Sequence, residues 1–425
     1  MKKLIIIGVL LTSSTSFLAQ TFTNIKIDEA NASAGPEEPT ICVSLKDTNV
    51  IMAGVNIKTT YLSTDAGFTW KKQPMKSKYG VYGDPCIIST NSGKFMYFHL
   101  SLVKGKPYED ESFLDRIVCQ YTKKKPSKFH KGKYMGLNKP KDQDKEWAVY
   151  DQVRERTYVT WTQFDKYGSK DTNDRSVILG SFSDNNGKSW SDPVTLSQIT
   201  GNCIDNDNTT EGAVPAIGLN GEMHVAWAND EKIYFTTFEE GKEVPKEKII
   251  AEQPGGWVQE IEGLNRTNGL PVTVSDMSTG PHRGNIYVCW SDQRNGELNT
   301  DIFITKSIDG GNSWSSPKKV NDDNSHTQQF LPWITVDQST GYLYTIFYDR
   351  RNYTDSQTDV YLAVSKDGGN TFINHKISDS PFTPLSYVFF GDYINISAHQ
   401  GVVRPIWTRY ENGQLSVWTA IVKGI

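Results

Sequence analysis

The sequence lacks the features that mark membrane-spanning, helical and nucleic-acid-binding proteins. Beyond a short apolar run near its start, no segment approaches the ~18 apolar residues that a membrane-spanning helix needs. No long stretch keeps the 3.6-residue apolar period of an amphipathic helix, which argues against a helical fold. The formal net charge is −4 and we find no lysine- or arginine-rich stripe, so we expect no nucleic-acid partner.

Cysteine is also scarce, and its pattern argues against two kinds of site. The five cysteines are an odd number, and no pair has the C-x-x-C spacing of a metal-binding motif. Four lie inside apolar, strand-like runs, where a buried free thiol is expected: Cys42, Cys86, Cys119 and Cys289. We therefore predict free thiols and no metal bound by cysteine.

The N-terminus has the order of a secretory signal. Lys2 and Lys3 precede an apolar run at residues 4–11, and small polar residues then lead to Ala19. We predict that residues 1–19 are a signal peptide and that residues 20–425 form one exported domain, either secreted or periplasmic.

Aromatic residues and a repeated octapeptide are what the chain does have. Aromatics make up 12% of the residues, which is typical of an all-β protein. The pattern Ser-x-Asp-x-Gly-x-x-Trp occurs at residues 63–70 and 307–314, with looser copies at 183–190 and 365–372. Each copy follows a strand-like run, so we interpret these Asp boxes as tight turns closed by the Asp side chain and the Gly.

A longer unit of roughly 60 residues surrounds these boxes, and it has room for four short strands. The first strands of seven such units begin near Glu38, Asp84, Glu146, Glu211, Pro271, Leu331 and Gly391. The seventh unit is one strand short, and residues 22–27 can supply that strand and close a ring. The sequence thus predicts an all-β propeller of four-stranded antiparallel blades. We favour seven blades, with six as the alternative because units two and four lack an Asp box.

Asp boxes on an exported, strand-rich chain resemble the sialidase-like (BNR repeat) β-propeller superfamily, and the resemblance covers most of the mature chain. In a sialidase it would imply three arginines around the substrate carboxylate, a tyrosine–glutamate nucleophile and an aspartate acid. The family's first arginine has no counterpart at residues 37–41, and the first arginine of the chain is Arg116. The resemblance implies a glycan-active protein, an exo-glycosidase acting on terminal acidic sugars. The alternative is a non-catalytic propeller that binds glycan or protein through the same face.

Blade topology indicates where a site would lie. First strands begin, and second strands end, on one face of a propeller, while the Asp-box turns lie on the opposite face. On this first face, the resemblance implies that Asp84 is the acid. It implies that Tyr393 or Tyr387, paired with Glu211, is the nucleophile. A second set, at equivalent positions of units five to seven, would bind the substrate carboxylate: Arg294, Arg350 and Arg409. The alternative for these arginines is that each forms a salt bridge between strands.

Two further groups have competing interpretations. Residues 205–208 have the oxygen density of a calcium loop without the EF-hand spacing, so we consider Ca²⁺ alongside a solvated loop and expect no other cofactor. Four tryptophans near second-strand ends could stack on sugars or pack between blades: Trp161, Trp227, Trp290 and Trp407. We expect a monomer whose partner is a carbohydrate or glycoconjugate.

Overall fold

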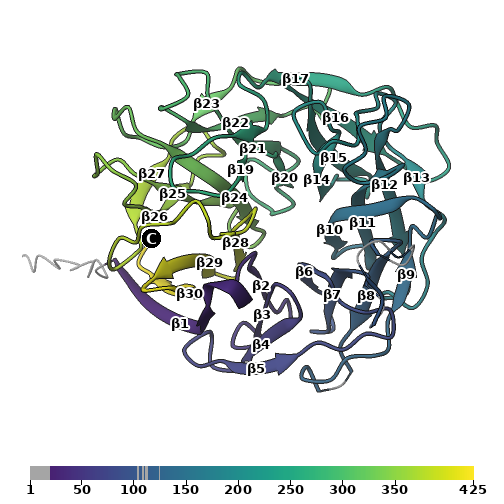
Figure 1. The fold of residues 1–425 in the computed structure, drawn as a ribbon, viewed down its shortest axis with the longest axis horizontal. Coiled ribbons are helices and arrows are strands. Elements are labelled where there is room, and N and C mark those ends of the chain that lie inside the picture. Colours follow the sequence, from purple (N-terminus) through teal and green to yellow (C-terminus); the bar gives the residue numbers. More distant parts are fainter. Residues whose placement is uncertain (1–19, 103–104, 108–109, 111–112, 124) are drawn as a thin grey trace, which may run out of the picture.

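The computed structural model describes residues 20–425, apart from 103–104, 108–109, 111–112 and 124. Seven four-stranded antiparallel sheets stand around a central axis as the blades of a propeller (Figure 1). Among the described residues, the one helical element is the 3-10 helix η1 (Ala32–Ala34). The all-β prediction and the choice of seven blades over six are confirmed. The predicted signal peptide at residues 1–19 lies outside the described residues.

Blades 1 to 4 each use four consecutive strands, which run in order from the innermost to the outermost (Figure 1). Blade 1 is β2 (Thr40–Val43), β3 (Ile51–Val55), β4 (Thr59–Ser63) and β5 (Lys71–Pro74). Blade 2 is β6 (Gly83–Ser89), β7 (Phe95–Leu100), β8 (Ile117–Tyr121) and β9 (Lys133–Met135). Blade 3 is β10 (Asp142–Asp151), β11 (Arg156–Phe164), β12 (Ser176–Ser183) and β13 (Val194–Thr195). Blade 4 is β14 (Glu211–Ile217), β15 (Met223–Asn229), β16 (Lys232–Phe238) and β17 (Lys248–Glu252).

The remaining blades follow a hairpin that has no counterpart elsewhere in the described ring. This hairpin is β18 (Val258–Gln259) with β19 (Thr267–Asn268). Blade 5 is β20 (Val272–Ser275), β21 (Ile286–Asp292), β22 (Asp301–Ser307) and β23 (Lys318–Lys319). Blade 6 is β24 (Gln329–Asp337), β25 (Tyr342–Asp349), β26 (Asp359–Ser365) and β27 (Ile373–Lys376). Blade 7 is β28 (Asn395–His399), β29 (Val402–Glu411), β30 (Gln414–Lys423) and β1 (Thr21–Asn31).

The two ends of the chain close the ring. Strand β1 pairs with β30 in antiparallel fashion, from Thr21 opposite Lys423 to Asn31 opposite Gln414. The predicted N-terminal contribution to blade 7 is therefore confirmed. Closure gives blade 7 four strands like the others, so its sheet is complete at the junction of the two chain ends.

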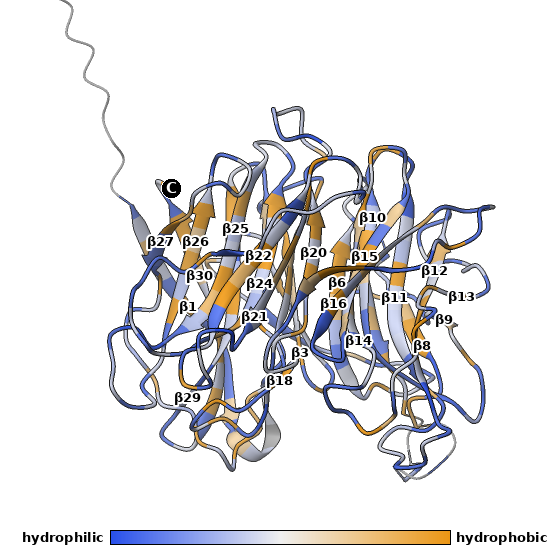
Figure 2. Cartoon of the chain, turned by 90° about the horizontal axis from the view of Figure 1, so that it is seen from above, coloured by the Kyte–Doolittle hydropathy of each residue, from blue (hydrophilic) through white to orange (hydrophobic). Residues whose placement is uncertain are grey.

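Burial follows from the stacking of blades. Each middle strand is covered on both faces by neighbouring blades, so β3 and β21 are buried along their whole length and are apolar on both sides. The outermost strands are short and polar, as in β5, where three of four residues are exposed. Figure 2 shows hydrophobic residues along the strands and hydrophilic ones in the connecting loops. The four strand cysteines are unpaired, and three of them are fully buried.

The Asp boxes form the connections between third and fourth strands. In blade 5, Asp309 Oδ1 accepts hydrogen bonds from the backbone N–H of Ser313 at 2.9 Å and of Asn312 at 3.1 Å. Gly311 has φ 84°, and a Cβ there would lie 2.4 Å from the Phe235 ring of blade 4, so this turn requires glycine. The Asp box thus closes its own hairpin through hydrogen bonds and packs against the preceding blade. Its placement on the face opposite the site stays a prediction.

We predict a pH-dependent effect of Asp309→Ala on thermal stability. The hydroxyl of Ser313 and backbone N–H donors lower the pKa of Asp309 from 3.8 to about 2. The stabilisation from this depressed pKa is therefore present above pH 4 and lost as the pH falls through 2. At pH 7 we expect Asp309→Ala to lower the unfolding midpoint by about 2 °C, with the difference from wild type vanishing near pH 2 in calorimetric scans.

Asp309→Asn is the matched control for this experiment. The chain already carries this change in blade 3, where Asn185 Oδ1 accepts the N–H of Ser189 at 2.9 Å. Asn at position 309 should therefore keep the backbone bonds and cost less than Ala. Equal losses in both variants would contradict the role we give to the acceptor oxygen.

Candidate functional site

A repeated irregularity of the first strands builds one mouth of the ring. Near their starts, the pairing of β6, β10, β14 and β24 with the second strand shifts register, which marks a β-bulge. Each bulge holds one residue at positive φ: Asp84 (50°), Lys145 (51°), Gly212 (82°) and Leu331 (49°). Glu38, with φ 51°, holds the equivalent place before β2. A left-handed backbone costs about 1 kcal/mol for a residue other than glycine, and it turns the side chain away from the normal strand direction.

Three of these re-aimed side chains line one pocket of about 430 Å³: Glu38, Asp84 and Lys145. The other charged groups in its wall are Glu37, Asp144 and Arg266, and its aromatic members are Tyr82, Phe113, Tyr167 and Phe389. Four carboxyl groups therefore face two cations. Such a wall offers hydrogen-bond acceptors to sugar hydroxyls, an acid or base for proton transfer, and aromatic rings for stacking.

The two cations are held by a carboxylate from across the ring. Asp392, which precedes β28, accepts from Lys145 Nζ at 2.9 Å and from Arg266 Nε at 2.7 Å. Lys145 belongs to blade 3 and Arg266 to the β18–β19 hairpin, so the pairs join three separate parts of the chain. Burial would raise the pKa of Asp392, but the charges of Lys145 and Arg266 outweigh burial and hold it well below its usual range.

Two carboxyl groups in the pocket wall titrate near neutrality. Burial, and then the charge of Asp84, raise the pKa of Glu37 to about 7. Burial likewise raises the pKa of Asp144 to about 7, although Lys145 lowers it. A carboxyl group with a pKa near 7 can give a proton at neutral pH, which an ordinary aspartate or glutamate cannot do efficiently.

Two further glutamates are buried beside the pocket without partners. Glu146 is 1% exposed and Glu211 is not exposed at all, and within the described part of the chain no group donates a hydrogen bond to their carboxyl oxygens. Burial is the largest cause that raises both pKa values well above the ordinary range. Burial therefore favours the protonated form of both groups.

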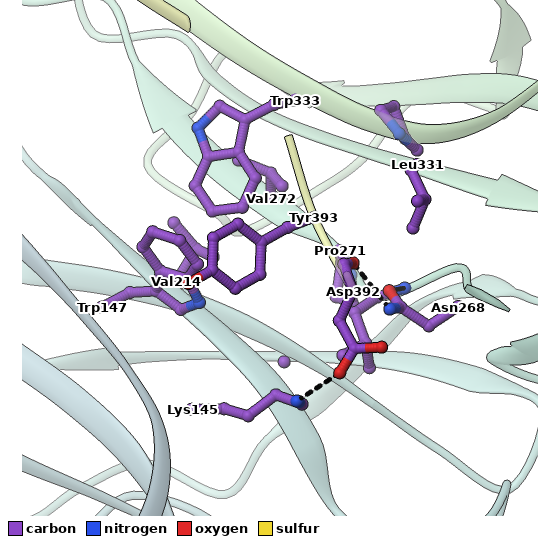
Figure 3. Close-up of a pocket in the computed structure, with 13 residues that line it drawn as sticks. Lys145, Trp147, Val214, Asn268, Pro271, Val272, Leu331, Trp333, Asp392 and Tyr393 are labelled. Atoms are coloured by element: carbon purple, nitrogen blue, oxygen red, sulfur yellow. Dashed lines mark hydrogen bonds and ion pairs between the residues drawn. The ribbon is translucent and has the colours of Figure 1, made fainter. Parts of the chain in front are cut away.

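Aromatic side chains of the innermost strands close the floor of the mouth. The ring centres of Trp147 and Trp333 are 4.2 Å apart, and Tyr393 packs edge-on against Trp147 at 4.9 Å (Figure 3). They border a small cavity of about 30 Å³, which Lys145 and Asp392 also line. Lys145 lines both this cavity and the charged pocket, so the aromatic side chains of Figure 3 form an apolar plug beside the pocket.

The structure separates the residues that the sequence assigned to catalysis. Asp84 lines the pocket, and its backbone N–H donates to Asn56 Oδ1 at 2.8 Å. Tyr393 lies in the plug, and no hydrogen bond links it to Glu211 among the described residues. Burial raises the pKa of Tyr393, and Asp84 is the acidic group that adds most to that shift. Tyr387, the other tyrosine considered, is 77% exposed.

The three predicted arginines are each bound by local partners, and none lines the pocket of Asp84. The partners are Asp292 for Arg294, Gln328 and the Glu262 carbonyl for Arg350, and Asp379 for Arg409. Arg294 and Arg409 each form a salt bridge, the first with Asp292 two residues earlier and the second with Asp379, whereas Arg350 bonds to an amide oxygen and a backbone carbonyl. Their role in binding a substrate carboxylate stays a prediction.

Sequence reasoning missed the two cations that do line the pocket. Lys145 stands one residue before a predicted strand start, so its place in the bulge was the signal that could have found it. Arg266 lies in a hairpin that no other described unit repeats, and a comparison of units therefore passes over it. Asp144 was also missed, because it lies two residues before the strand start predicted at Glu146.

The remaining predicted groups have structural partners. Trp161, Trp227, Trp290 and Trp407 are completely buried, which confirms packing rather than sugar stacking. In the loop at 205–208, Asp205 accepts from the Tyr167 hydroxyl at 2.7 Å and Asp207 accepts from the Val258 N–H at 2.7 Å. Among the residues with described positions, no group of three or more His, Cys, Asp or Glu has the arrangement of a metal site. A Ca²⁺ ion at this loop stays a prediction.

Solved structures of two glycan-active enzymes are similar to this chain in fold. An ulvan lyase of family PL25, solved bound to -[GlcA(1-4)Rha3S]-, matches with a TM-score of 0.56 and 12% identity, over 94% of this chain and 98% of that one. The NanB sialidase from Streptococcus pneumoniae matches with a TM-score of 0.50 and 9% identity, over 88% and 83%. In fold, the chain is a β-propeller similar to the propellers of these two enzymes. At these identities the likeness shows the fold alone.

Sequence comparison adds no closer relationship. No protein-family profile matches the chain, and no curated protein does. Within the described residues, no helix is long and apolar enough to cross a bilayer.

We predict that Asp392→Asn strongly destabilises the protein at pH 7. The substitution leaves the buried Lys145 without its charge partner, which costs about 3–5 kcal/mol for a buried pair. Because the pKa of Asp392 is depressed in the fold, its contribution is present above the pKa of an unfolded aspartate and is lost in acid. Urea unfolding at pH 7 and at pH 3 should show the difference from wild type shrinking at the lower pH.

Asp184→Asn is the matched control, because Asp184 pairs with Arg156 at the surface and its side chain is 56% exposed. An exposed pair contributes less than about 1 kcal/mol. Similar losses in the two variants would show that the pairs across the mouth contribute no more than a surface ion pair.

Proposed function

We propose that this chain is an exported, glycan-active protein that binds a terminal sugar in the pocket of Asp84 and hydrolyses its glycosidic bond. The observation that carries the proposal is the wall of this pocket, where two carboxyl groups have a pKa of about 7 beside further carboxylates. Glycoside hydrolysis needs one protonated carboxyl group to donate to the leaving oxygen and a second to assist attack. The apolar plug beside the pocket favours a chain end over the middle of a polymer.

The proposed roles follow from position. Asp84 projects into the pocket from its bulge and acts as the acid, with Glu37 and Asp144 as the neighbouring groups able to hold a proton at neutral pH. The tyrosine nucleophile proposed from the resemblance, Tyr393, lies in the floor, where Asp84 is the acidic group with the strongest influence on its ionisation. Glu211 is buried beside the pocket, where burial raises its pKa and disfavours the carboxylate that would assist the tyrosine.

An acidic sugar is the proposed substrate class because the pocket wall contains two cations. Lys145 and Arg266 are paired with Asp392, and a substrate carboxylate would share or replace that partner. Both structural neighbours fit this class: a sialidase, and a lyase bound to a disaccharide that contains GlcA. The alternative, a non-catalytic propeller that binds glycan or protein through the same mouth, uses the same wall without turnover.

We predict that the mature chain hydrolyses an aryl glycoside of an acidic sugar faster than a neutral one. The test measures kcat/KM for an α-sialoside, a β-glucuronide and a β-galactoside with wild type, Asp84→Asn and the surface control Asp355→Asn. Loss of a general acid should lower kcat/KM by about 10²–10⁴-fold in Asp84→Asn, and the control should match wild type.

Each other outcome has a definite meaning. Glycan binding without turnover would support the non-catalytic alternative, and an unsaturated sugar product would show elimination instead of hydrolysis. Unchanged kcat/KM in Asp84→Asn would remove Asp84 from the proposed role. Faster turnover of the galactoside would overturn the acidic substrate class.

We also predict that kcat/KM falls as the pH rises through 7. Glu37 and Asp144 are protonated below their raised pKa of about 7 and lose the proton above it, so the protonated fraction of this pair, which supplies the proton to the acid Asp84, falls about tenfold per pH unit. Glu37→Gln and Asp144→Asn should identify the group, because the variant that lacks it loses the alkaline limb. A flat profile between pH 6 and 9 in wild type would exclude both residues.

A further inference from the structure

A second charged feature lies on the outer rim of the ring, between blades 1 and 2 (Figure 1). A groove of about 710 Å³ separates β5 and the chain after it from the chain that joins β8 to β9. Five exposed or half-exposed lysines line this lysine groove: Lys71, Lys72, Lys76, Lys78 and Lys131. The expectation that the chain has no lysine-rich face is therefore wrong. Folding joins two short basic segments that are about 50 residues apart in the sequence.

The lysine groove is basic although the whole chain is acidic. Neither residues 71–83 nor residues 117–141 contain any aspartate or glutamate. Lys72 pairs with Asp28 at 2.6 Å. The other four lining lysines have no carboxylate within 4.0 Å among the described residues, so their charges are not neutralised by the protein. Unpaired cations gathered in a concave surface concentrate positive potential there.

Further lysines extend the basic surface beyond the groove. Four lie on the β8–β9 connection and at the start of β9: Lys123, Lys125, Lys128 and Lys133. His130, in the groove wall, is affected by this field. Partial burial lowers its pKa, and the positive charges of Lys123, Lys94 and Lys188 lower it further. The last two come from blade 2 and from the Asp box of blade 3, so the positive field extends to a third blade.

The two walls of the groove are held together by one side chain. Gln120 Nε2 donates to the Lys76 carbonyl and to the His130 carbonyl, each at 3.0 Å. Phe129 adds an apolar contact to blade 2, with its ring 6.1 Å from that of the buried Tyr97. The shape is therefore formed before any ligand binds, which limits the entropy lost on binding.

Aromatic rings adjoin the lysines at one end. Lys78 Nζ lies 4.5 Å from the centre of the Tyr79 ring, and Tyr79 packs edge-on against Tyr134 at 5.3 Å. Tyr134 is 41% exposed on β9, between Lys133 and Met135. The Arg116 guanidinium lies 5.2 Å from the centre of the Tyr79 ring and 4.8 Å from that of Tyr134. The exposed edge of Tyr134 and the half-exposed Tyr79 therefore offer an aromatic surface beside several cations, where a sugar ring can pack while its acidic group is paired.

We propose that the lysine groove binds an acidic polysaccharide, whose carboxylate or sulfate groups pair with the lysines while sugar rings stack at Tyr79 and Tyr134. The groove lies on the rim rather than at the mouth, so this binding is separate from the pocket of Asp84 and does not depend on its proposed activity. A groove with hydroxyl and amide groups in its wall, from Ser77, Ser127 and Gln73, suits the hydroxyls of a sugar chain.

Two other polyanions fit the surface less well. A phosphate backbone is commonly recognised by the bidentate fork of arginine, but no arginine lines the groove itself. The fork of Arg116, which lies over the two tyrosines, is already bound by Asp115. A membrane surface is flat, whereas the lysines here face one another across a concave groove. The predicted export also places the chain among polysaccharides rather than nucleic acids.

The test compares two variants of equal net charge. The groove variant carries Lys71→Gln, Lys76→Gln, Lys78→Gln and Lys131→Gln, and the control carries Lys170→Gln, Lys242→Gln, Lys246→Gln and Lys366→Gln, at surface positions away from the groove. Binding to immobilised polygalacturonate, chondroitin sulfate and neutral dextran is measured at about 50 and 300 mM salt, where screening of exposed charges differs strongly. Thermal unfolding midpoints equal to wild type verify that both variants are folded.

We expect wild type to bind at least one acidic polymer, more weakly at the higher salt, and not dextran. The Kd should rise about tenfold or more in the groove variant and less than about twofold in the control. Binding to polygalacturonate would identify carboxylate as sufficient, and binding to chondroitin sulfate alone would identify sulfate. Equal weakening of both variants, absence of binding to both acidic polymers, or tighter binding to duplex DNA or phosphatidylserine vesicles would overturn the proposal.

Discussion

The site depends on ring closure by the pairing of β1 with β30. Blade 7 has no other source for its outermost strand among the described residues, and Asp392 enters the mouth from the chain that leads into this blade. Only a closed ring brings Asp392 within reach of Lys145, which is 247 residues earlier in the sequence. The charged pocket and its aromatic floor are therefore products of long-range geometry, although several members are held by local bulges.

The mouth and the rim differ in the sign and the burial of their ionisable side chains. At the mouth, carboxyl groups are buried together, and burial and neighbouring acids raise the pKa values of Glu38, Glu146 and Glu211 well above the ordinary range. Asp392 remains ionised, because two cations hold it. On the rim, exposed lysines gather with few carboxylates beside them, so the same near-neutral chain has an acidic centre and a basic edge. A net charge of −4 describes neither surface.

The fold could be predicted because the Asp box is a local signal that repeats. Ser307, Asp309 and Gly311 specify a turn through bonds within a few residues, and four such turns inside units of similar length specify blades. The charged site was harder, because its members lie in bulges where side-chain direction departs from strand alternation. Asp84 was found from its place at a strand start, but Lys145 and Arg266 were not, since neither repeats between units. The lysine groove was missed because its two segments come from different blades.

The β-bulge that several blades share also affects how the residues of this mouth can change in evolution. A residue with a left-handed backbone occupies the same structural position in several blades. The side chains at these positions therefore surround one opening. Two carry acids, one carries an amine, one carries leucine and one carries no side chain at all, at Gly212. At Glu38, Asp84 and Lys145 a single codon change alters a side chain that lines the pocket, whereas at Gly212 a Cβ would lie 2.7 Å from Leu270 and glycine is required. The ring thus separates the part of the protein that must be preserved from the part that is free to diverge.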